Sequence, residues 1–190
     1  MLLLASKSPR RREILTNAGL KFEVRPPDVL EARCDGEAPA DYVRRLAQSK
    51  AEAVVRGRDD IALGADTVVI VDNIVLEKPA GAADAVRMLR LLAGRDHEVV
   101  TGICLASGSG LIVEVETTRV HFGPMTSDEI EGYVASGEPL DKAGAYAIQG
   151  LASKFIDRIE GDYFNVVGLP IARVYRHLRS LWREQQLSDS

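Results

Sequence analysis

The chain has 190 residues, of which 46% are hydrophobic and 27% are charged, a balance that excludes wholesale disorder and favours one folded domain over residues 1–190. The formal net charge of -4 argues against non-specific binding to nucleic acid, which favours a basic protein face. No apolar stretch approaches the roughly 20 residues of a membrane span, and Met1–Ala5 is too short for a signal peptide, so we expect a cytoplasmic protein without a membrane partner.

The N-terminal half is predicted to alternate strands with helices. Leu2–Ala5 is expected as a short buried strand. The next helix begins at Pro9, behind an N-cap at Ser8, and ends before Gly19. Three elements are expected after it: a helix at Asp41–Val55 closed by Gly57, a buried strand at Ile61–Val71 and a helix at Ala82–Leu92 closed by Gly94.

The C-terminal half is predicted to begin with a β-hairpin. Its strands, Glu98–Ala106 and Leu111–Phe122, flank a Ser-Gly-Ser-Gly turn. Thr126 and Glu129 form a capping box for the following helix. Two short strands at Ala152–Ile156 and Tyr163–Val167 and a closing helix opened by Pro170 complete the prediction. Together these elements predict an α/β chain with a mixed sheet.

Four places break the local rules, and such places are often functional. The first is the turn Ser6–Arg12, where three arginines lie at a helix N-terminus that already carries a partial positive charge. Backbone N–H groups, the hydroxyls of Ser6 and Ser8 and the guanidinium groups can together hold a phosphate. The same pattern also fits a solvated basic turn, and it is not a Walker A loop because the Gly-Lys-Ser/Thr end is missing.

The second place is Lys50, which shares one helical stripe with Val43, Ala47 and Val54. A lysine on such a stripe is either buried with a partner or reaches solvent from the stripe's edge. Both interpretations remain open from the pattern alone.

The third place is Asp66, a carboxylate within the apolar strand Ile61–Val71. A buried carboxylate is unfavourable unless it is paired, hydrogen-bonded or bound to metal, so Asp66 indicates a functional site. The alternative is an aspartate in a turn at a strand end, with Gly64 as a bulge.

The fourth place is the segment Lys142–Gly150, which is rich in small residues and has neither helical nor strand period. Such a segment can bring backbone close to a ligand, although taken alone it favours a tight connection against the sheet. Glu31 and the pair Glu77-Lys78 lie in predicted loops, where charges are usually just solvated.

Six sequence blocks in one order carry a family resemblance. They are Ala5-Ser-Lys-Ser-Pro-Arg-Arg11, Arg45-Leu-Ala-Gln-Ser-Lys50-Ala, Gly64-Ala-Asp-Thr-Val68, Leu76-Glu-Lys-Pro79, Asp141-Lys-Ala-Gly-Ala-Tyr-Ala-Ile-Gln-Gly150 and Val167-Gly-Leu-Pro170. Over nearly the whole chain they resemble the Maf family of nucleotide pyrophosphatases. The resemblance implies an elongated mixed β-sheet with flanking helices and two lobes around a cleft, similar to inosine triphosphate pyrophosphatases, and a homodimer.

The resemblance also implies a reaction and a substrate. Members convert a nucleoside triphosphate and water to a monophosphate and pyrophosphate with a divalent cation such as Mg²⁺ or Mn²⁺. Arg10, Thr67 and Gln149 match the three discriminating positions of the branch that prefers dTTP and UTP. A branch that acts on 7-methyl-GTP carries Trp, Gln and Glu there. We therefore expect dTTP and UTP, or modified pyrimidine triphosphates, as substrates in nucleotide-pool housecleaning.

The resemblance assigns a role to each candidate residue. Asp66 is the expected general base and a metal ligand, with Glu31 as the second carboxylate. The other roles are phosphate binding by Arg10, Arg11, Lys50 and Lys78, of which the two lysines also count as catalytic, hydrogen-bond donation by Ser6 and Ser8, and base recognition by Thr67 and Gln149.

Three positions depart from the family pattern. Ala147 stands where the family usually has glycine, and Asp141 stands where glycine is common. Neither change removes a chemical group. Leu30 precedes Glu31 where relatives often have a second acidic residue, so the expected metal site has one carboxylate fewer.

The main alternative is a non-catalytic nucleotide-binding regulator of cell division. It would keep the phosphate-binding turn but would not need a general base or metal carboxylates. Because Asp66, Glu31 and Lys78 are all present, we expect a hydrolase of phosphoanhydride bonds.

Overall fold

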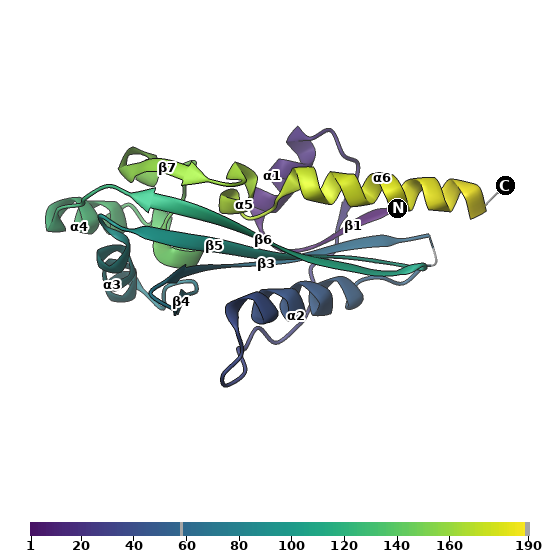
Figure 1. Cartoon of the computed structure of the whole chain (residues 1–190), viewed down its shortest axis with the longest axis horizontal. Coiled ribbons are helices and arrows are strands. Elements are labelled where there is room, and N and C mark those ends of the chain that lie inside the picture. The colour runs from purple at the N-terminus through teal and green to yellow at the C-terminus, as the bar shows by residue number, and fades with distance from the viewer. Residues whose placement is uncertain (58, 189–190) are drawn as a thin grey trace. The chain divides into compact units, whose positions relative to one another are not determined.

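The computed structural model describes residues 1–57 and 59–188 and contains a seven-stranded sheet with flanking helices (Figure 1). The strand order is β2-β1-β3-β5-β6-β7, and β4 pairs with β3. Parallel and antiparallel pairs both occur, so the predicted α/β class with a mixed sheet is confirmed.

The chain divides into two compact units, which are described separately. Unit 1 comprises Met1–Asp66, Thr101–Glu116 and Gly168–Ser190, and unit 2 comprises Thr67–Val100 and Thr117–Val167. The single domain over residues 1–190 and the cleft between two lobes stay predictions.

Strand β1 (Leu2–Ala5) is buried throughout and lies between β2 (Glu23–Val24) and β3 (Ile61–Val71). Both pairings are parallel, and an unbroken apolar run is typical of a strand that is buried on both faces. The register pairs Ala5 with Gly64. The chain therefore leaves β1 beside Gly64, two residues before Asp66 on the neighbouring strand.

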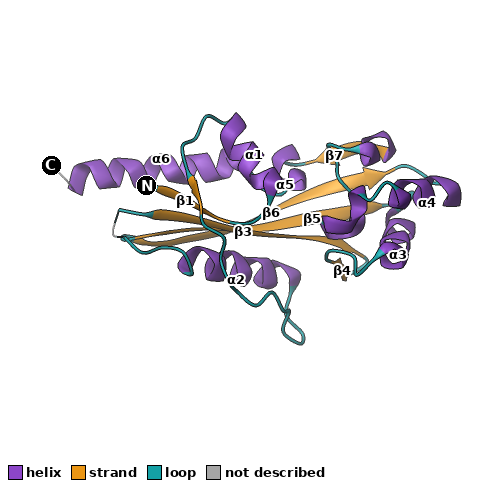
Figure 2. Cartoon of the chain, turned by 180° about the vertical axis from the view of Figure 1, so that it is seen from behind, coloured by secondary structure: helices purple, strands orange, loops and turns teal. Residues whose placement is uncertain are grey.

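Three helices cover the strands of unit 1: α1 (Pro9–Asn17), α2 (Pro39–Glu52) and α6 (Ile171–Ser188). Helices α2 and α6 lie on opposite sides of these strands (Figure 2). Helix α2 packs closely because glycines face it. A Cβ at Gly64 on β3 would lie 2.0 Å from the Ala47 carbonyl oxygen, and one at Gly102 on β5 would lie 2.3 Å from the Val43 carbonyl oxygen.

The closing helix α6 buries one narrow stripe of its apolar residues. Val174, Leu178 and Leu181 are buried, whereas Tyr175 is exposed and Trp182 is half-buried. In the described part of the chain, no helix has both the length and the apolar character that a membrane crossing would require.

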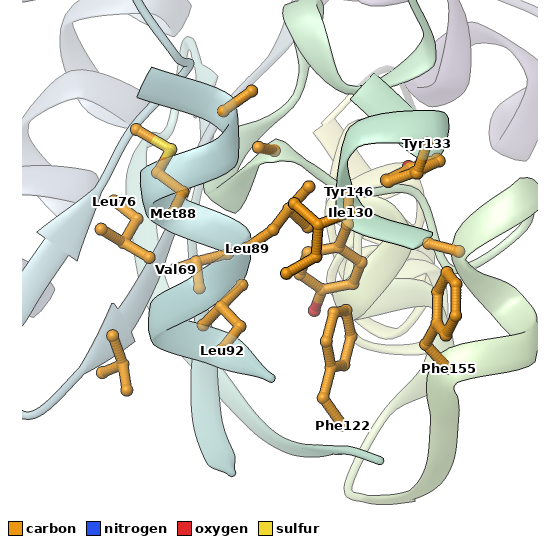
Figure 3. Close-up of a cluster of buried hydrophobic side chains, with 14 of the residues drawn as sticks. Val69, Leu76, Met88, Leu89, Leu92, Phe122, Ile130, Tyr133, Tyr146 and Phe155 are labelled. Carbon is orange, nitrogen blue, oxygen red and sulfur yellow. The ribbon is translucent and has the colours of Figure 1, made fainter. Parts of the chain in front are cut away.

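Unit 2 has its own apolar core, shown in Figure 3. Its helices are α3 (Ala82–Leu92), α4 (Ser127–Ala135) and α5 (Tyr163–Val167), and its strands are β4 (Ile74–Leu76), β7 (Ile156–Glu160) and parts of β3, β5 (Asp96–Ser107) and β6 (Gly110–Phe122). Phe122 and Tyr146 meet edge to face with ring centroids 4.8 Å apart. Leu89 and Leu92 of α3 complete this part of the core.

Several predicted elements are confirmed, together with the sequence features that predicted them. Strands β1 and β3 and helix α3 have the predicted bounds. Strands β5 and β6 are neighbours in the sheet and are joined by a turn at residues 108–109. Both hydrogen bonds of the Thr126–Glu129 capping box form at the start of α4.

Two predicted strands are wrong. Ala152–Ile156 forms mostly a 3-10 helix, Leu151–Phe155, and the strand β7 begins only at Ile156. The charged residues of β7 give no apolar strand pattern, so the sequence did not predict this strand. Charged side chains are common on exposed strands. Tyr163–Val167 is helix α5, because the Asp162 carboxylate accepts from main-chain N–H groups of the first turn.

Helix α2 also begins and ends earlier than predicted. It starts at Pro39, which occupies the first turn, and ends at Glu52. Gly57 does not cap it, and the Gly57 N–H donates instead to the Asp60 carboxylate. The apolar run Ala53–Val55 extended the helical pattern beyond the true end.

Candidate active site

The predicted phosphate-binding turn leaves β1 and opens α1 in unit 1. The Ser8 side chain accepts a hydrogen bond from the Arg11 N–H (3.4 Å), and the Ser8 N–H donates to Ser6 Oγ (3.1 Å). No acidic side chain lies in the first turn of α1, and Arg10 there is half-buried. The helix dipole and the arginines therefore make this turn positive, as an anion site requires.

Arg11 is buried and ties the turn to its surroundings. Its Nε donates to the Gly168 carbonyl (2.9 Å), and its Nη1 donates to the Ala65 carbonyl (2.8 Å) and to Ser6 Oγ (3.3 Å). Burial lowers the pKa of Arg11, and nearby Asp66 acts in the opposite direction. The side chain thus anchors α1 to β3, while its assignment to phosphate stays a prediction.

A buried lysine between two carboxylates is the central feature of unit 1. Lys50 Nζ lies 2.7 Å from Asp66 Oδ1 and 2.8 Å from Glu31 Oε1. Lys50 is 5% exposed and Asp66 is 8% exposed, whereas Glu31 is half-exposed. Because Lys50 is buried and paired, it does not reach solvent from the stripe's edge, and Asp66 lies within β3 rather than in a turn.

The position of Asp66 follows from strand alternation. Gly64 and Asp66 are two residues apart and therefore face the same side, where Gly64 contacts Ala47 of α2. Lys50 follows Ala47 by one helical turn and so meets Asp66. Burial raises the pKa of Asp66, while Lys50 and Arg11 act in the opposite direction. A raised pKa makes the ionised carboxylate a stronger base.

Arg45 of α2 holds the loop that carries Glu31. Its Nε and Nη2 each lie 2.7 Å from an oxygen of the Glu37 carboxylate, and Nη2 also donates to the Ala32 carbonyl (2.9 Å). The Arg45 hydrogen bonds help to hold the pKa of Glu37 low, at about 2. Because Ala32 follows Glu31, these contacts fix where Glu31 meets Lys50.

The donor set of unit 1 fits a hard divalent cation. In residues 1–57 and 59–188, no group of three or more His, Cys, Asp or Glu side chains forms a metal cluster. Mg²⁺ is usually held by one or two carboxylates together with water and substrate phosphates. Glu31 and Asp66, which meet around Lys50, supply such a pair.

In unit 2 the chain after β4 returns toward Thr67, the residue at which the unit 2 part of β3 begins. Strands β3 and β4 pair antiparallel, with Val69 opposite Leu76. Continued by two residues, this register would set Lys78 opposite Thr67. Thr67 is half-buried and Lys78 is exposed.

The segment Lys142–Gly150 lies against the same strand of unit 2. The Gly144 N–H donates to the Glu77 carbonyl (3.1 Å), which precedes Lys78. A Cβ at Gly144 would lie 2.7 Å from Val69 Cγ2, so only glycine allows this approach. Gln149 is exposed at the far end of the segment. The tight connection predicted for this segment is confirmed, and it places the segment beside the Lys78 loop.

Sequence reasoning missed two supporting pairs, Arg45–Glu37 in unit 1 and Tyr133–Glu138 in unit 2. Tyr133 Oη donates to Glu138 Oε1 (2.7 Å). Arg45 stood in one of the six blocks, and a role for it was indicated by its place on the same helix as Lys50. Its partner Glu37 could not be predicted, because Glu37 lies outside the helix, in the loop that precedes α2.

Comparison with known proteins decides the family. A sequence model described as Maf-like protein matches residues 1–181. The chain belongs to the Maf family. The resemblance based on the six blocks is therefore confirmed, and the matched region includes every candidate residue of this Maf protein.

Curated Maf relatives resemble the chain over nearly its full length. A dTTP/UTP pyrophosphatase of Koribacter versatilis is 55% identical over 179 residues, which is 94% of this chain and 93% of the relative. One of Symbiobacterium thermophilum is 51% identical over 178 residues, 93% of this chain and 92% of the relative. Among solved structures, a HAM1 protein from Coxiella burnetii matches 78% of this chain and 87% of its own, with 15% identity and a TM-score of 0.44.

Proposed function

We propose that this Maf protein hydrolyses dTTP and UTP, and modified pyrimidine triphosphates, to the nucleoside monophosphate and pyrophosphate in the cytoplasm. The name dTTP/UTP pyrophosphatase belongs to relatives that are 55% and 51% identical to it. The residues expected at the three substrate-discriminating positions, Arg10, Thr67 and Gln149, are all present.

The observation that carries the proposal is the buried pair Lys50–Asp66, joined by the half-exposed Glu31, beside the phosphate-binding turn. Arg11 of that turn interacts electrostatically with Asp66, so both belong to one region of unit 1. A protein that only bound nucleotide would need the cations, but a buried carboxylate with a raised pKa would weaken its affinity for an anion. Such a carboxylate is explained by proton transfer.

In the proposed reaction, the oxygen of a water molecule forms a bond to the α-phosphorus. The bond from that phosphorus to the oxygen bridging the α- and β-phosphates breaks, and pyrophosphate leaves with the bridging oxygen. Asp66 accepts the proton of the attacking water. Atoms and charge balance without a further reactant.

Lys50 couples substrate binding to the availability of the base. In the free protein its ammonium group neutralises Asp66 and opposes the rise in that residue's pKa. When Lys50 turns to a phosphate oxygen, the Asp66 carboxylate loses this partner and becomes available to the attacking water and to the divalent cation.

The other residues neutralise and orient the triphosphate. Arg10 and Lys78 offer cations, and Ser6 and Ser8 offer hydroxyl and main-chain donors. Glu31 and Asp66 would hold the divalent cation, which when bound would neutralise developing charge on the phosphates.

The experiment is a product analysis with purified protein, pyrimidine and purine triphosphates, and Mg²⁺ or Mn²⁺. We expect equal amounts of monophosphate and pyrophosphate from dTTP and UTP. Orthophosphate as the first product would indicate a phosphatase instead. Nucleotide binding without any product would favour the non-catalytic regulator of cell division.

A homodimer also belongs to this proposal, because the family commonly forms one. Light scattering is expected to give twice the chain mass of 20.7 kDa. A mass that stays at the chain value across micromolar concentrations would contradict it.

A further inference from the structure

Gln149 lies in a tight turn of unit 2. The Gly150 N–H donates to the Ala147 carbonyl (3.1 Å), which closes the turn over residues 147–150. Neither strand nor helix includes Gln149. Its position therefore depends on what holds the two ends of the turn.

Two side chains hold these ends. Tyr133 Oη accepts a hydrogen bond from the Ala147 N–H (3.2 Å) before the turn. The two oxygens of the Glu138 carboxylate accept from the Leu151 N–H after the turn (3.0 and 3.1 Å). Tyr133 Oη also donates to Glu138 Oε1 (2.7 Å), so a single hydrogen-bonded pair connects both ends.

Gly150 allows the carboxylate to lie directly against the turn. A Cβ at this position would lie 2.3 Å from Glu138 Oε2 and 2.4 Å from Oε1. Any side chain at position 150 would displace Glu138 from the Leu151 N–H. The glycine at the end of the fifth sequence block, Asp141–Gly150, thus has a spatial reason.

Glu138 is engaged within the protein. Its oxygens accept from one phenol and one main-chain N–H, and the Lys142 ammonium group donates to its main-chain carbonyl (2.7 Å). Burial and the Glu138 hydrogen bond raise the pKa of Tyr133, so the phenol keeps its proton as a donor. These contacts suit a positioning role and not proton transfer to substrate.

We propose that Tyr133 and Glu138 are positioning residues for substrate selection, because they fix the turn that presents Gln149. This inference rests on the proposed function, in which Gln149 recognises the base. Uracil and thymine share an O4 acceptor and an adjacent N3–H donor, and one side-chain amide can bond to both. A fixed turn holds that amide in place before the nucleotide binds, which lowers the entropy lost on binding.

The test removes each contact with little change in shape. Tyr133→Phe deletes the hydroxyl, and Glu138→Gln replaces one acceptor oxygen with a donor. Each variant is expected to raise the KM for dTTP and UTP roughly fivefold to tenfold, the scale of one lost hydrogen bond, and to change kcat less than about threefold. The inhibition constant of inorganic tripolyphosphate, which has no base, is expected to stay unchanged.

Matched controls separate positioning from folding. Tyr163→Phe deletes the same hydroxyl from an exposed tyrosine in α5. Glu129→Gln makes the same exchange in the capping box of α4, away from the turn, where glutamine can still accept the capping hydrogen bond. Both controls are expected to keep the wild-type KM for dTTP, even where Glu129→Gln lowers the melting temperature.

A double-mutant cycle for binding decides whether the effect passes through Gln149. Calorimetry with a UTP analogue carrying an imido group between the α- and β-phosphates measures binding without hydrolysis. Gln149→Ala is expected to weaken binding, and Tyr133→Phe is expected to add less than twofold to that loss. Losses that multiply fully would overturn the inference.

The same measurement distinguishes the two proposals. A wild-type protein that binds the analogue but releases no pyrophosphate from UTP would refute the proposed hydrolysis, and the cycle would still decide the role of Tyr133. A wild-type protein that does not bind the analogue would overturn both.

Discussion

Unit 1 and unit 2 bury polar groups of different kinds. Among the described residues, the buried charged side chains are those of Arg11, Lys50 and Asp66, and all three belong to unit 1. In unit 2 the buried polar side chains are neutral. His97, for example, is 2% exposed, and burial lowers its pKa to about 4.

The different buried groups indicate different roles for the two units. Buried charges are unfavourable for stability unless they are paired, so their concentration in unit 1 indicates chemistry on a charged substrate. The neutral groups of unit 2 instead hold main chain, as Tyr133 does at Ala147. Removing a buried charged group from unit 1 should therefore change both the stability of the protein and its turnover. Removing a neutral group that holds main chain in unit 2 should change the position of that main chain and the affinity for substrate.

Lys50→Met should have the largest effect, because it leaves the Asp66 carboxylate buried without its closest cation. We expect a loss of about 3–5 kcal/mol in the free energy of unfolding and at least a roughly 100-fold loss of kcat. Urea unfolding and pyrophosphate release measure the two. Arg44→Met, which removes an exposed cation from the same helix, is the control and should change neither greatly.

The double variant Lys50→Met/Asp66→Asn sharpens this result, because it leaves neither charge of the pair in place. It should recover much of the stability lost in the single variant, yet it should remain inactive. Recovery of turnover would show that neither residue takes part in the reaction.

The pH dependence of stability should reveal the neutral histidine of unit 2. Burial lowers the pKa of His97 from 6.5 to about 4. Between these values the unfolded chain binds a proton that the folded chain does not, so stability is full above pH 6.5 and falls as the pH drops toward 4. The expected loss is about 3 kcal/mol.

Urea unfolding at several pH values measures this loss. His97→Gln should flatten the dependence between pH 6.5 and 4. Tyr146→Phe removes only the hydroxyl that lies 2.8 Å from His97 Nε2, and it should keep the dependence. An unchanged slope in His97→Gln would mean that another group causes it.

Arg11→Met should have a smaller effect on stability. It removes the two hydrogen bonds that the guanidinium group donates to the Ala65 and Gly168 carbonyls, and we expect a loss of about 2 kcal/mol. Arg12→Met changes an exposed arginine of the same helix and should cost little. If Arg11→Met is as stable as Arg12→Met but binds triphosphate poorly, Arg11 is a ligand for phosphate and not an anchor.

Much of the fold could be predicted because its signals are local. The apolar run of β3 and the Thr126–Glu129 capping box each lie within a few consecutive residues. The strand β7 could not be predicted, since its partner β6 determines it and its own sequence is largely charged. Helix α5 could have been recognised from Asp162, a capping residue that the apolar pattern concealed.

The site could be predicted in its residue types but not in its contacts. A lone lysine on an apolar helical stripe and a lone aspartate in an apolar strand each required a partner, and sequence spacing gave no means to join Lys50 with Asp66. Gly64 determines their meeting, because it lets α2 lie close to β3. The anchoring contacts of Arg11 likewise depend on Gly168, which is 157 residues away.

Asp66→Asn tests the central claim most directly, because it keeps the size of the side chain and removes its ability to accept a proton from water. Steady-state pyrophosphate release from dTTP should fall by at least roughly 100-fold, while thermal unfolding shows a folded protein. Turnover within a fewfold of the wild type in this folded variant would contradict the assignment of Asp66 as the general base.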